Sequence, residues 1–262
     1  MKRLLFALSF LAVCVSSASA QYIMSIHKTD GGVVNIDAEE IVRMSVVEPE
    51  NHSTPYEYVD LGLSVKWATY NIGATRPEEI GGYYAWGETT EKYEYTWDNY
   101  KFGTKGYFSG YGLTKYCCSY GHGLNGFEDG KHRLDPEDDV AHVLWGGNWR
   151  MPTLDDVIEL YSNCDLELDW INGVEGFRLT SKVPGYTGNS VFFPFGGYSL
   201  GVDCVFGEGR ALLYWTSESY LELDSGFYWG NDEGLFFDVP LFQINILTRD
   251  RSDGLNVRAV CP

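Results

Sequence analysis

The sequence predicts a mixed α+β fold, in which two short helices are followed by many short antiparallel strands joined by long loops, with a small β unit ahead of them. Two helical segments with capping residues lie close together between residues 135 and 161. After the turn signal Asn172-Gly173, short apolar runs are separated by glycines and polar residues. Helices followed by a run of strands, without strand–helix alternation, are typical of the α+β class.

Residues 1–20 have the pattern of a secretory signal peptide. The positive start Met1-Lys2-Arg3 precedes an apolar run from Leu4 to Val15, and Ser17–Ala20 form a small-residue cleavage site. The apolar run is shorter than the roughly 20 residues that span a bilayer core. We therefore expect an exported protein, located in the cell envelope (periplasm or outer surface) or secreted.

The net charge of the chain limits the classes of partner that it can bind. It holds 19 basic and 37 acidic residues, and its net charge of −18 at pH 7 becomes −20 once Lys2 and Arg3 leave with the signal peptide. Such a chain repels nucleic-acid phosphates and anionic lipids, so we expect no nucleic-acid binding and no direct electrostatic membrane binding. A hydrophobic content of 44% excludes a disordered acidic tail.

The cysteines leave two questions open. Cys14 lies in the signal segment, and its lipidation is an alternative to cleavage after Ala20, although bulky Val13 disfavours it. The other cysteines are Cys117, Cys118, Cys164, Cys204 and Cys261. An odd number cannot pair completely within one chain, so the disulfide pairing stays undetermined. We expect Cys164 to be a small buried hydrophobe, and the spacing favours no metal or redox site.

Residues 21–48 form a small β unit. Ile23–Lys28 and Val33–Ile36 flank a turn that contains Asp-Gly, a strong hairpin signal. Val42–Val47 is expected to be a third strand. Because so small a unit buries little surface alone, we expect it to lean on the main domain or on a partner.

A polar, proline-containing linker at residues 49–56 leads to the main domain, residues 57–262. Its first helix is predicted to begin at Asp135, an N-cap candidate followed by Pro136 and three acidic residues. The apolar face of this helix is expected to hold Val140, Val143 and Leu144.

The second helix is predicted to begin at Thr153, because Thr153 and Asp156 form a variant of the capping box. Its apolar face is expected to hold Leu154, Val157, Ile158 and Tyr161. The strands predicted after it are Phe177–Ser181, Val191–Pro194, Leu212–Ser217, Gly234–Asp238, Gln243–Leu247 and Val257–Val260.

Several segments, in order from about Tyr58 to Val260, resemble the Fibrobacter succinogenes major paralogous domain family. They are Val59–Thr69, Asn71–Ala74, Tyr83–Thr89, Lys115–Cys117, Asp138–Ala141, Trp145–Thr153, Phe192–Pro194, Gly196–Tyr198, Tyr214–Ser217 and Val257–Val260. The segment His27–Gly31 also resembles one often found ahead of this domain.

The resemblance implies a C-type-lectin-like fold, related to that of formylglycine-generating enzymes, in an exported protein. Most members of the family have no assigned activity. Four tryptophans belong to the family pattern and are expected in the core: Trp67, Trp86, Trp149 and Trp215.

The candidate ligand-binding surface is the Gly/Tyr-rich stretch from Tyr100 to Tyr120. Exposed tyrosines in such loops can stack on sugar rings or anchor a protein. The candidate ligand-binding residues are Tyr107, Phe108, Tyr111, Tyr120 and, in a separate segment, Trp229. The alternative is that these rings pack the long loops onto the core.

No metal or cofactor is expected. The acidic run Asp135–Asp139 offers oxygen ligands for a cation, but helix capping and an ion pair with an arginine such as Arg150 explain it as well. Trp229–Asp232 only approximates one of the motifs through which C-type lectins bind sugar by way of calcium.

No catalytic residues are expected either. Ser217 and Ser219 have no evident His or Asp partner in the sequence. Histidines 122, 132 and 142 cannot share a helical face and are expected in surface loops. Formylglycine-generating enzymes use a cysteine pair, but the residues around Cys204 and Cys261 do not resemble theirs.

The sequence therefore predicts a non-enzymatic binding module for a glycan or a surface protein. The alternative is a structural or assembly component of the cell surface, in which the small β unit pairs with another chain. An enzyme is the least favoured of the three, and the sequence fixes neither the ligand nor the oligomeric state.

Overall fold

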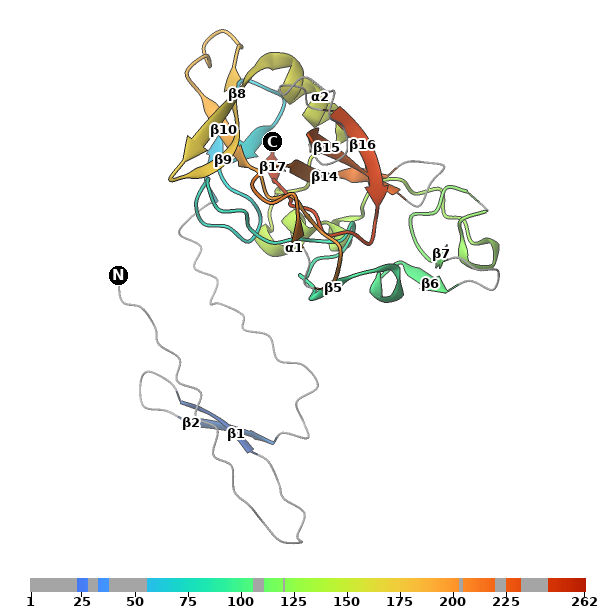
Figure 1. Ribbon diagram of the computed structural model, residues 1–262. Helices are drawn as coiled ribbons and strands as arrows, with labels where there is room; N and C mark the ends of the chain where they lie inside the picture. The colour runs from blue at the N-terminus through green and yellow to red at the C-terminus, as the bar shows by residue number, and fades with distance from the viewer. Residues whose placement is uncertain are drawn as a thin grey trace, which may run out of the picture. The chain divides into compact units, whose positions relative to one another are not determined.

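The computed structural model describes residues 23–27, 33–37, 56–105, 111–119, 121–202, 205–219, 225–231 and 245–262 (Figure 1). The predicted signal peptide, the predicted strands Val42–Val47 and Gly234–Asp238, and all but the last residue of the linker lie outside these ranges. The chain divides into two compact units, residues 1–54 and residues 55–262. Among the described residues there is no helix long and apolar enough to cross a membrane.

The first unit contains the predicted hairpin. Strand β1 (Ile23–His27) pairs antiparallel with β2 (Val33–Asp37), in a register that places Ile23 opposite Asp37 and His27 opposite Val33. The second strand extends one residue beyond the predicted Ile36.

The second unit has few helices and many short strands, which confirms the mixed α+β class. Its strands up to the helices are β3 (Tyr58–Val59), β4 (Lys66–Ala68), β5 (Glu94–Tyr95), β6 (Gly103–Lys105) and β7 (Tyr111–Leu113). Its described residues include three short 3-10 turns, η2 (Trp97–Asn99), η3 (Leu124–Gly126) and η4 (Pro136–Asp138). They also include two α-helices, α1 (Val140–Trp145) and the longer α2 (Leu154–Asn163).

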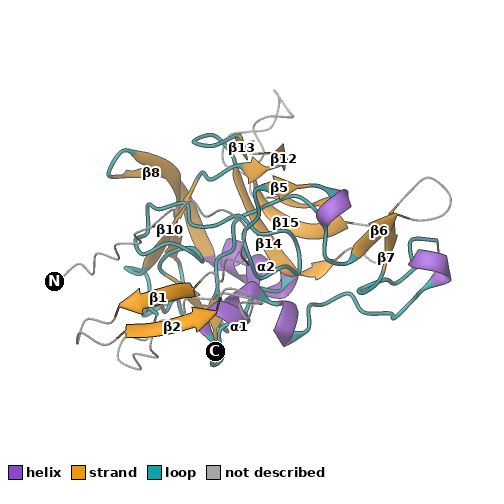
Figure 2. Cartoon of the chain, turned by 90° about the horizontal axis from the view of Figure 1, so that it is seen from below, coloured by secondary structure: helices purple, strands orange, loops and turns teal. Residues whose placement is uncertain are grey.

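The later strands are β8 (Cys164–Ile171), β9 (Val174–Ser181), β10 (Ser190–Pro194), β11 (Tyr198–Ser199), β12 (Gly201–Val202), β13 (Val205–Phe206), β14 (Leu212–Ser219), β15 (Ser225–Asn231), β16 (Asn245–Asp250) and β17 (Val260–Cys261). The hairpin β6–β7 lies at the opposite end of the unit from β8–β10 (Figures 1 and 2).

Antiparallel pairing joins the two ends of the second unit. The sheet β17–β4–β3 places Val260 opposite Trp67 and Tyr58 opposite Ala68, so the first and last strands share a neighbour. The other three-stranded sheets are β10–β9–β8 and β14–β15–β16. Small two-stranded pairings, such as β12 with β5, attach the long connections.

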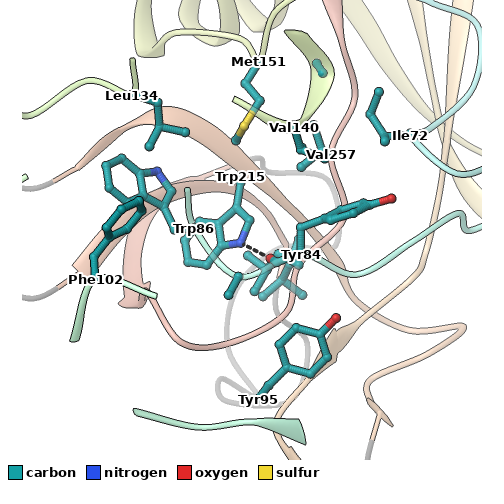
Figure 3. Packing of buried hydrophobic residues seen from close by; sticks show 14 of the residues in the cluster. Ile72, Tyr84, Trp86, Tyr95, Phe102, Leu134, Val140, Met151, Trp215 and Val257 are labelled. Atoms are coloured by element: carbon teal, nitrogen blue, oxygen red, sulfur yellow. Dashed lines mark hydrogen bonds between the residues drawn. The ribbon is translucent and has the colours of Figure 1, made fainter. Parts of the chain in front are cut away.

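Strand β14 separates two apolar cores. Leu213 and Trp215 belong to a cluster around Trp86, whereas Leu212 and Tyr214 belong to a second cluster around Trp67. Successive side chains of a strand point to opposite faces, so both faces of β14 are buried, one against each cluster. In the first cluster the indoles of Trp86 and Trp215 lie next to each other, and Trp215 Nε1 donates to the Tyr84 carbonyl at 2.8 Å (Figure 3).

Three of the four tryptophans predicted in the core are fully buried, namely Trp67, Trp86 and Trp215. Trp149 is only half-buried and packs against the edge of the first cluster. The expected burial of Cys164 is confirmed, and burial raises the pKa of its thiol to about 11.

A buried arginine ties the C-terminal segment to two other segments of the chain, residues 68–71 and Phe192. Arg258 donates to Asn71 Oδ1, the Ala68 carbonyl and the Phe192 carbonyl at 2.8, 3.0 and 2.9 Å. Because a buried charge is tolerated only when its donors are satisfied, these bonds hold three distant segments in register. Burial still lowers the pKa of Arg258 to about 10.

The first predicted helix begins later than expected. Asp135 precedes the 3-10 turn η4 and makes no capping bond with its side chain, whereas Asp139 caps α1 by accepting from the N–H groups of Ala141 and His142. The predicted apolar face is also wrong, because Val143 and Leu144 are 45% and 46% exposed. Only Val140 of that set is buried. A helix of six residues has fewer than two turns, which is too short for periodicity to define a face.

In α2 the predicted capping box is confirmed, since the side chains of Thr153 and Asp156 each accept from the other residue's N–H. The predicted face is partly wrong, because Val157 and Leu160 are buried while Ile158 and Tyr161 are exposed. Helix α2 packs against β8 and β14, and this contact selects the buried side.

Among the predicted strands, Phe177–Ser181, Val191–Pro194 and Leu212–Ser217 lie within β9, β10 and β14. The described part of Gln243–Leu247 lies within β16, whereas Val257–Val260 is wrong except for its last residue, which begins β17. Strand β8 was missed. It forms a tight hairpin with β9 through Asn172 and Gly173, whose φ angles of 50° and 85° suit a two-residue turn.

Candidate functional site

Three aromatic rings of the predicted binding stretch pack into the core. Tyr100, Phe102 and Tyr116 are buried in the cluster around Trp86. The ring of Phe102 makes an edge contact with that of Tyr116, with 5.2 Å between centroids. The Tyr100 hydroxyl donates to the Trp86 carbonyl at 2.8 Å. For these rings, packing of the loop onto the core is the correct interpretation.

The five predicted ligand-binding side chains all lie outside the described part of the molecule. Tyr107, Phe108 and Tyr120 are outside the described ranges. The backbone of Tyr111 begins β7 and pairs with Lys105, and that of Trp229 lies in β15 between Tyr214 and Ile246. Their roles in ligand binding stay predictions.

The acidic run forms a compact cluster that lysines neutralise. Carboxylate oxygens of Asp135, Glu137 and Asp138 lie within 4.8 Å of one another. Lys115 Nζ lies 2.7, 3.5 and 2.5 Å from these three groups, in that order. Lys101 Nζ adds a contact of 2.6 Å to Asp138. The ammonium group of Lys115 thus supplies the positive charge that a bound cation would bring.

Asp138 anchors this cluster to the core. Its buried carboxylate also accepts from the Tyr116 hydroxyl at 2.6 Å. Burial alone would raise the pKa of Asp138, but hydrogen bonds from Lys101, Lys115 and Tyr116 outweigh it and lower the pKa. The suggested partner Arg150 is wrong for this run, because Arg150 pairs with Asp156 instead.

The nucleophiles singled out in the sequence make structural contacts. The Ser217 hydroxyl donates to the Pro152 carbonyl at 3.2 Å, and the Ser219 hydroxyl to the His132 carbonyl at 3.4 Å. The thiols of Cys118, Cys164 and Cys261 are free, and burial raises the pKa of each. Cys204 lies outside the described residues.

A surface pocket of about 310 Å³ lies beside the start of α1. Four stretches of chain line it: the residues before η4, the start of α1, the loop from residue 148 to 153, and β14 at Ser217. The polar and aromatic side chains on its wall include Arg133, Asp139, His142, Asn148, Trp149 and Arg150. A pocket of this volume is at the lower end of those that hold small ligands.

Asp139 lines the pocket and is hydrogen-bonded to two of the segments around it. Its Oδ1 accepts from the N–H groups of Ala141 and His142 at 2.9 and 3.1 Å, and its Oδ2 accepts from the Met151 N–H at 2.8 Å. Burial raises the pKa of Asp139, against the lowering effect of these hydrogen bonds. One carboxylate therefore joins the first turn of α1 to the loop that carries Trp149.

The two arginines are held by carboxylates outside the pocket lining. Arg150 donates to both oxygens of Asp156, at 2.7 and 3.2 Å, and to the Met151 carbonyl at 3.0 Å. Arg133 donates through Nε and a terminal nitrogen to Glu218 Oε1. The other oxygen of Glu218 accepts from the Leu154 N–H at 2.9 Å. Both guanidinium groups are thus oriented before any ligand arrives.

Trp149 and His142 complete the wall. The Trp149 carbonyl lies 3.3 Å from His142 Nδ1, and since a carbonyl can only accept, Nδ1 carries the proton in this contact. The indole of Trp149 meets that of Trp145 edge to face, with 5.0 Å between centroids. Chemically, the lining brings hydrogen-bond donors together with an aromatic residue.

Sequence reasoning did not identify this pocket. The sequence predicts Trp149 in the core and Arg150 as an ion-pair partner of the acidic run. The prediction of His142 in a surface loop is wrong, because His142 lies half-buried in α1. Asn148 is noted only as part of the family-like segment Trp145–Thr153, and no sequence pattern marks Arg133, because the pocket forms only when separate stretches of chain meet.

Comparison with family models, with curated proteins and with solved structures finds no match to this chain.

Proposed function

We propose that the protein is an exported, non-enzymatic binding protein, and that it binds a glycan in the pocket beside α1. The pocket is the observation that carries this proposal. Its lining includes Trp149 and two arginines that carboxylates hold in place, and an aromatic ring together with N–H donors is the combination that sugar rings need for stacking and for hydroxyl recognition. The candidate nucleophiles, by contrast, are engaged in backbone contacts.

The same proposal assigns the second unit to the C-type-lectin-like fold. Its first and last strands meet in one sheet, two α-helices follow each other between them, and long connections make up much of the chain. These features support the resemblance to the Fibrobacter succinogenes major paralogous domain family.

The predicted loop can contribute to the same surface. The Tyr116 hydroxyl accepts from the Asp135 N–H at 2.9 Å, which fastens the described part of the loop to the residues just before α1. The ligand-binding roles of Tyr107, Phe108, Tyr111 and Tyr120 stay predictions, and Trp229 belongs to a separate strand.

A glycan array probed with the chain from Gln21 onward tests the proposal. We expect binding to at least one glycan class, and loss of most of it in Trp149→Ala. Trp170→Ala is the matched control, since Trp170 is 55% exposed and does not line the pocket. Equal binding by Trp149→Ala and the parent chain, or no binding by the parent chain, would reject the pocket as a glycan site.

The alternative function is assembly at the cell surface through the small β unit. The observation that favours it is the two-stranded sheet β1–β2, which within the described residues has no third strand. An unpaired strand edge can accept a strand from another chain. Deleting residues 21–55 should then abolish association, measured by analytical ultracentrifugation, while the second unit keeps its near-UV circular dichroism.

A further inference from the structure

We propose that the pocket beside α1 selects a carboxylate, so that its ligand is an acidic sugar of the uronic acid type. This inference rests on the proposed function and narrows it to one ligand class. It follows from which hydrogen-bonding groups of the pocket wall are already used and which are still available.

The available groups are N–H donors. A guanidinium group has five N–H donors. Arg150 uses three in the bonds to Asp156 and Met151, and Arg133 uses two in the bonds to Glu218. Among the described residues, therefore, two donors of Arg150 and three of Arg133 have no protein acceptor.

The acceptors of the wall are largely taken. Asp139, the one carboxylate of the lining, already accepts three backbone N–H groups. The Thr153 hydroxyl donates to the Asp156 carboxylate and accepts from the Asp156 N–H, and the Ser217 hydroxyl donates to the Pro152 carbonyl. A ligand rich in donors would find few partners here, whereas a ligand that brings acceptors would find several.

A carboxylate suits these donors best. Two planar guanidinium groups at one pocket match the geometry of a carboxylate, and charge-assisted bonds of this kind are about twice as strong as neutral ones. Without Lys2 and Arg3 the net charge of −18 becomes −20, and this charge repels anions at long range, so short-range bonds rather than overall attraction must hold the ligand.

The rest of the wall suits a sugar ring. The volume of about 310 Å³ admits one pyranose unit, and the lining includes Trp149, which is half-buried and whose indole we take as the platform for the ring. Asn148 adds an amide that both donates and accepts, as sugar hydroxyls require. The arginines would bind the carboxylate, and the indole would stack against the sugar ring.

Isothermal titration of the chain from Gln21 onward with glucuronic acid and with glucose tests the inference. The two sugars differ only in the carboxylate at carbon 6. We expect glucuronic acid to bind about tenfold more tightly than glucose at pH 7, as for hydrogen bonds to a charged group. Arg133→Ala should remove most of that preference and Arg133→Lys part of it, because lysine keeps the charge but loses the planar fork.

Arg133 suits the test because its side chain is 57% exposed and does not belong to the buried core. The matched control is Arg76→Ala, an exposed arginine that also pairs with glutamates but does not line the pocket. It should leave both affinities unchanged.

The possible failures are distinguishable. Equal affinity for the two sugars, with both lost in Trp149→Ala, overturns the acidic ligand but keeps the pocket as a sugar site. A preference for glucuronic acid that Arg133→Ala leaves intact also overturns the inference. No binding of either sugar, together with a silent glycan array, rejects the proposed function itself.

Discussion

The short segment from Arg133 to Asp139 borders two charged regions that differ in how many hydrogen-bond donors they still have available for a ligand. On one side, three carboxylates gather around the ammonium group of Lys115, and each has a lysine within reach. On the other side, Asp139 and the two arginines are also bonded, yet the arginines keep unused donors. The cluster is the denser in charge, whereas the pocket lining contains N–H donors that Arg133 and Arg150 do not use in their ion pairs.

The comparison shows why density of charge is a poor guide to a binding site. Opposite charges in contact neutralise each other, and the acidic cluster is fastened to the core through Tyr116. A ligand needs groups that are oriented but not saturated. Experiments that remove one group at a time should therefore give stability effects at the cluster and at Asp139, and binding effects at the arginines.

The largest effect on stability is expected for Asp139→Ala. The change leaves the N–H groups of Ala141, His142 and Met151 without their acceptor, which should cost about 3 kcal/mol of unfolding free energy. Urea denaturation followed by tryptophan fluorescence measures it. Asp139→Asn keeps one oxygen and should cost about half as much. A loss below about 1 kcal/mol in the alanine variant would show that Asp139 does not hold the pocket together.

Asp138→Asn should have the next largest effect, and this effect should depend on pH. We expect a loss of about 2 kcal/mol at pH 7, because Lys101, Lys115 and Tyr116 lose a buried anionic acceptor. The pKa of Asp138 in the folded state is lowered from its usual 3.8. Its contribution is therefore present above pH 4 and is lost as the pH falls through the lower, folded-state pKa.

Unfolding free energies of the parent chain and Asp138→Asn between pH 7 and pH 3 check that prediction. The difference between the two should shrink as the pH falls below 4. A difference that stays constant over this range would mean that the carboxylate charge contributes nothing and that the cluster is held by shape alone.

Parts of the fold could be predicted because they depend on neighbours in the sequence. The capping box at Thr153 and the pairing of β1 with β2 depend on residues close together in the sequence, and both occur. Strand β8 could also have been predicted, since Leu166, Leu168 and Trp170 alternate with acidic residues. Its alternation follows α2 without any break, and the helical pattern obscured it.

Other features depend on contacts that a sequence does not display. Two aspartates, Asp135 and Asp139, each precede a helical turn, and only packing against the loop at Met151 decides that Asp139 is the true N-cap. The exposed Ile158 shows the same limit, because the position of α2 against β8 and β14 determines which side is buried. The pocket could not be predicted for this reason.

A third variant pair compares a lysine of the cluster with an arginine of the pocket. Lys115→Ala should lower the unfolding free energy by about 1 to 2 kcal/mol, because the buried carboxylate of Asp138 loses one of its cations. Arg133→Ala should lower it by about 1 kcal/mol or less, as is usual for an exposed pair. Thermal unfolding followed by circular dichroism ranks the two, and the reverse order would show that the pocket arginine is the more structural of the pair.

Calcium should have the smallest effect of all. The acidic cluster has the oxygen ligands that Ca²⁺ prefers, but Lys115 Nζ lies 2.5 to 3.5 Å from all three carboxylates, so an ion would have to displace a bonded ammonium group. We expect 1 mM CaCl₂ and 1 mM EDTA to give melting temperatures that agree within about 1 °C, because a ligand stabilises the folded state only in proportion to its binding.

Lys115→Ala is the informative comparison, since it removes the competing charge while keeping the acids. A calcium-dependent rise in that variant alone would show that the lysine takes the place of a cation, whereas a rise in the parent chain would make the cluster a genuine metal site and reverse the contrast between the two regions.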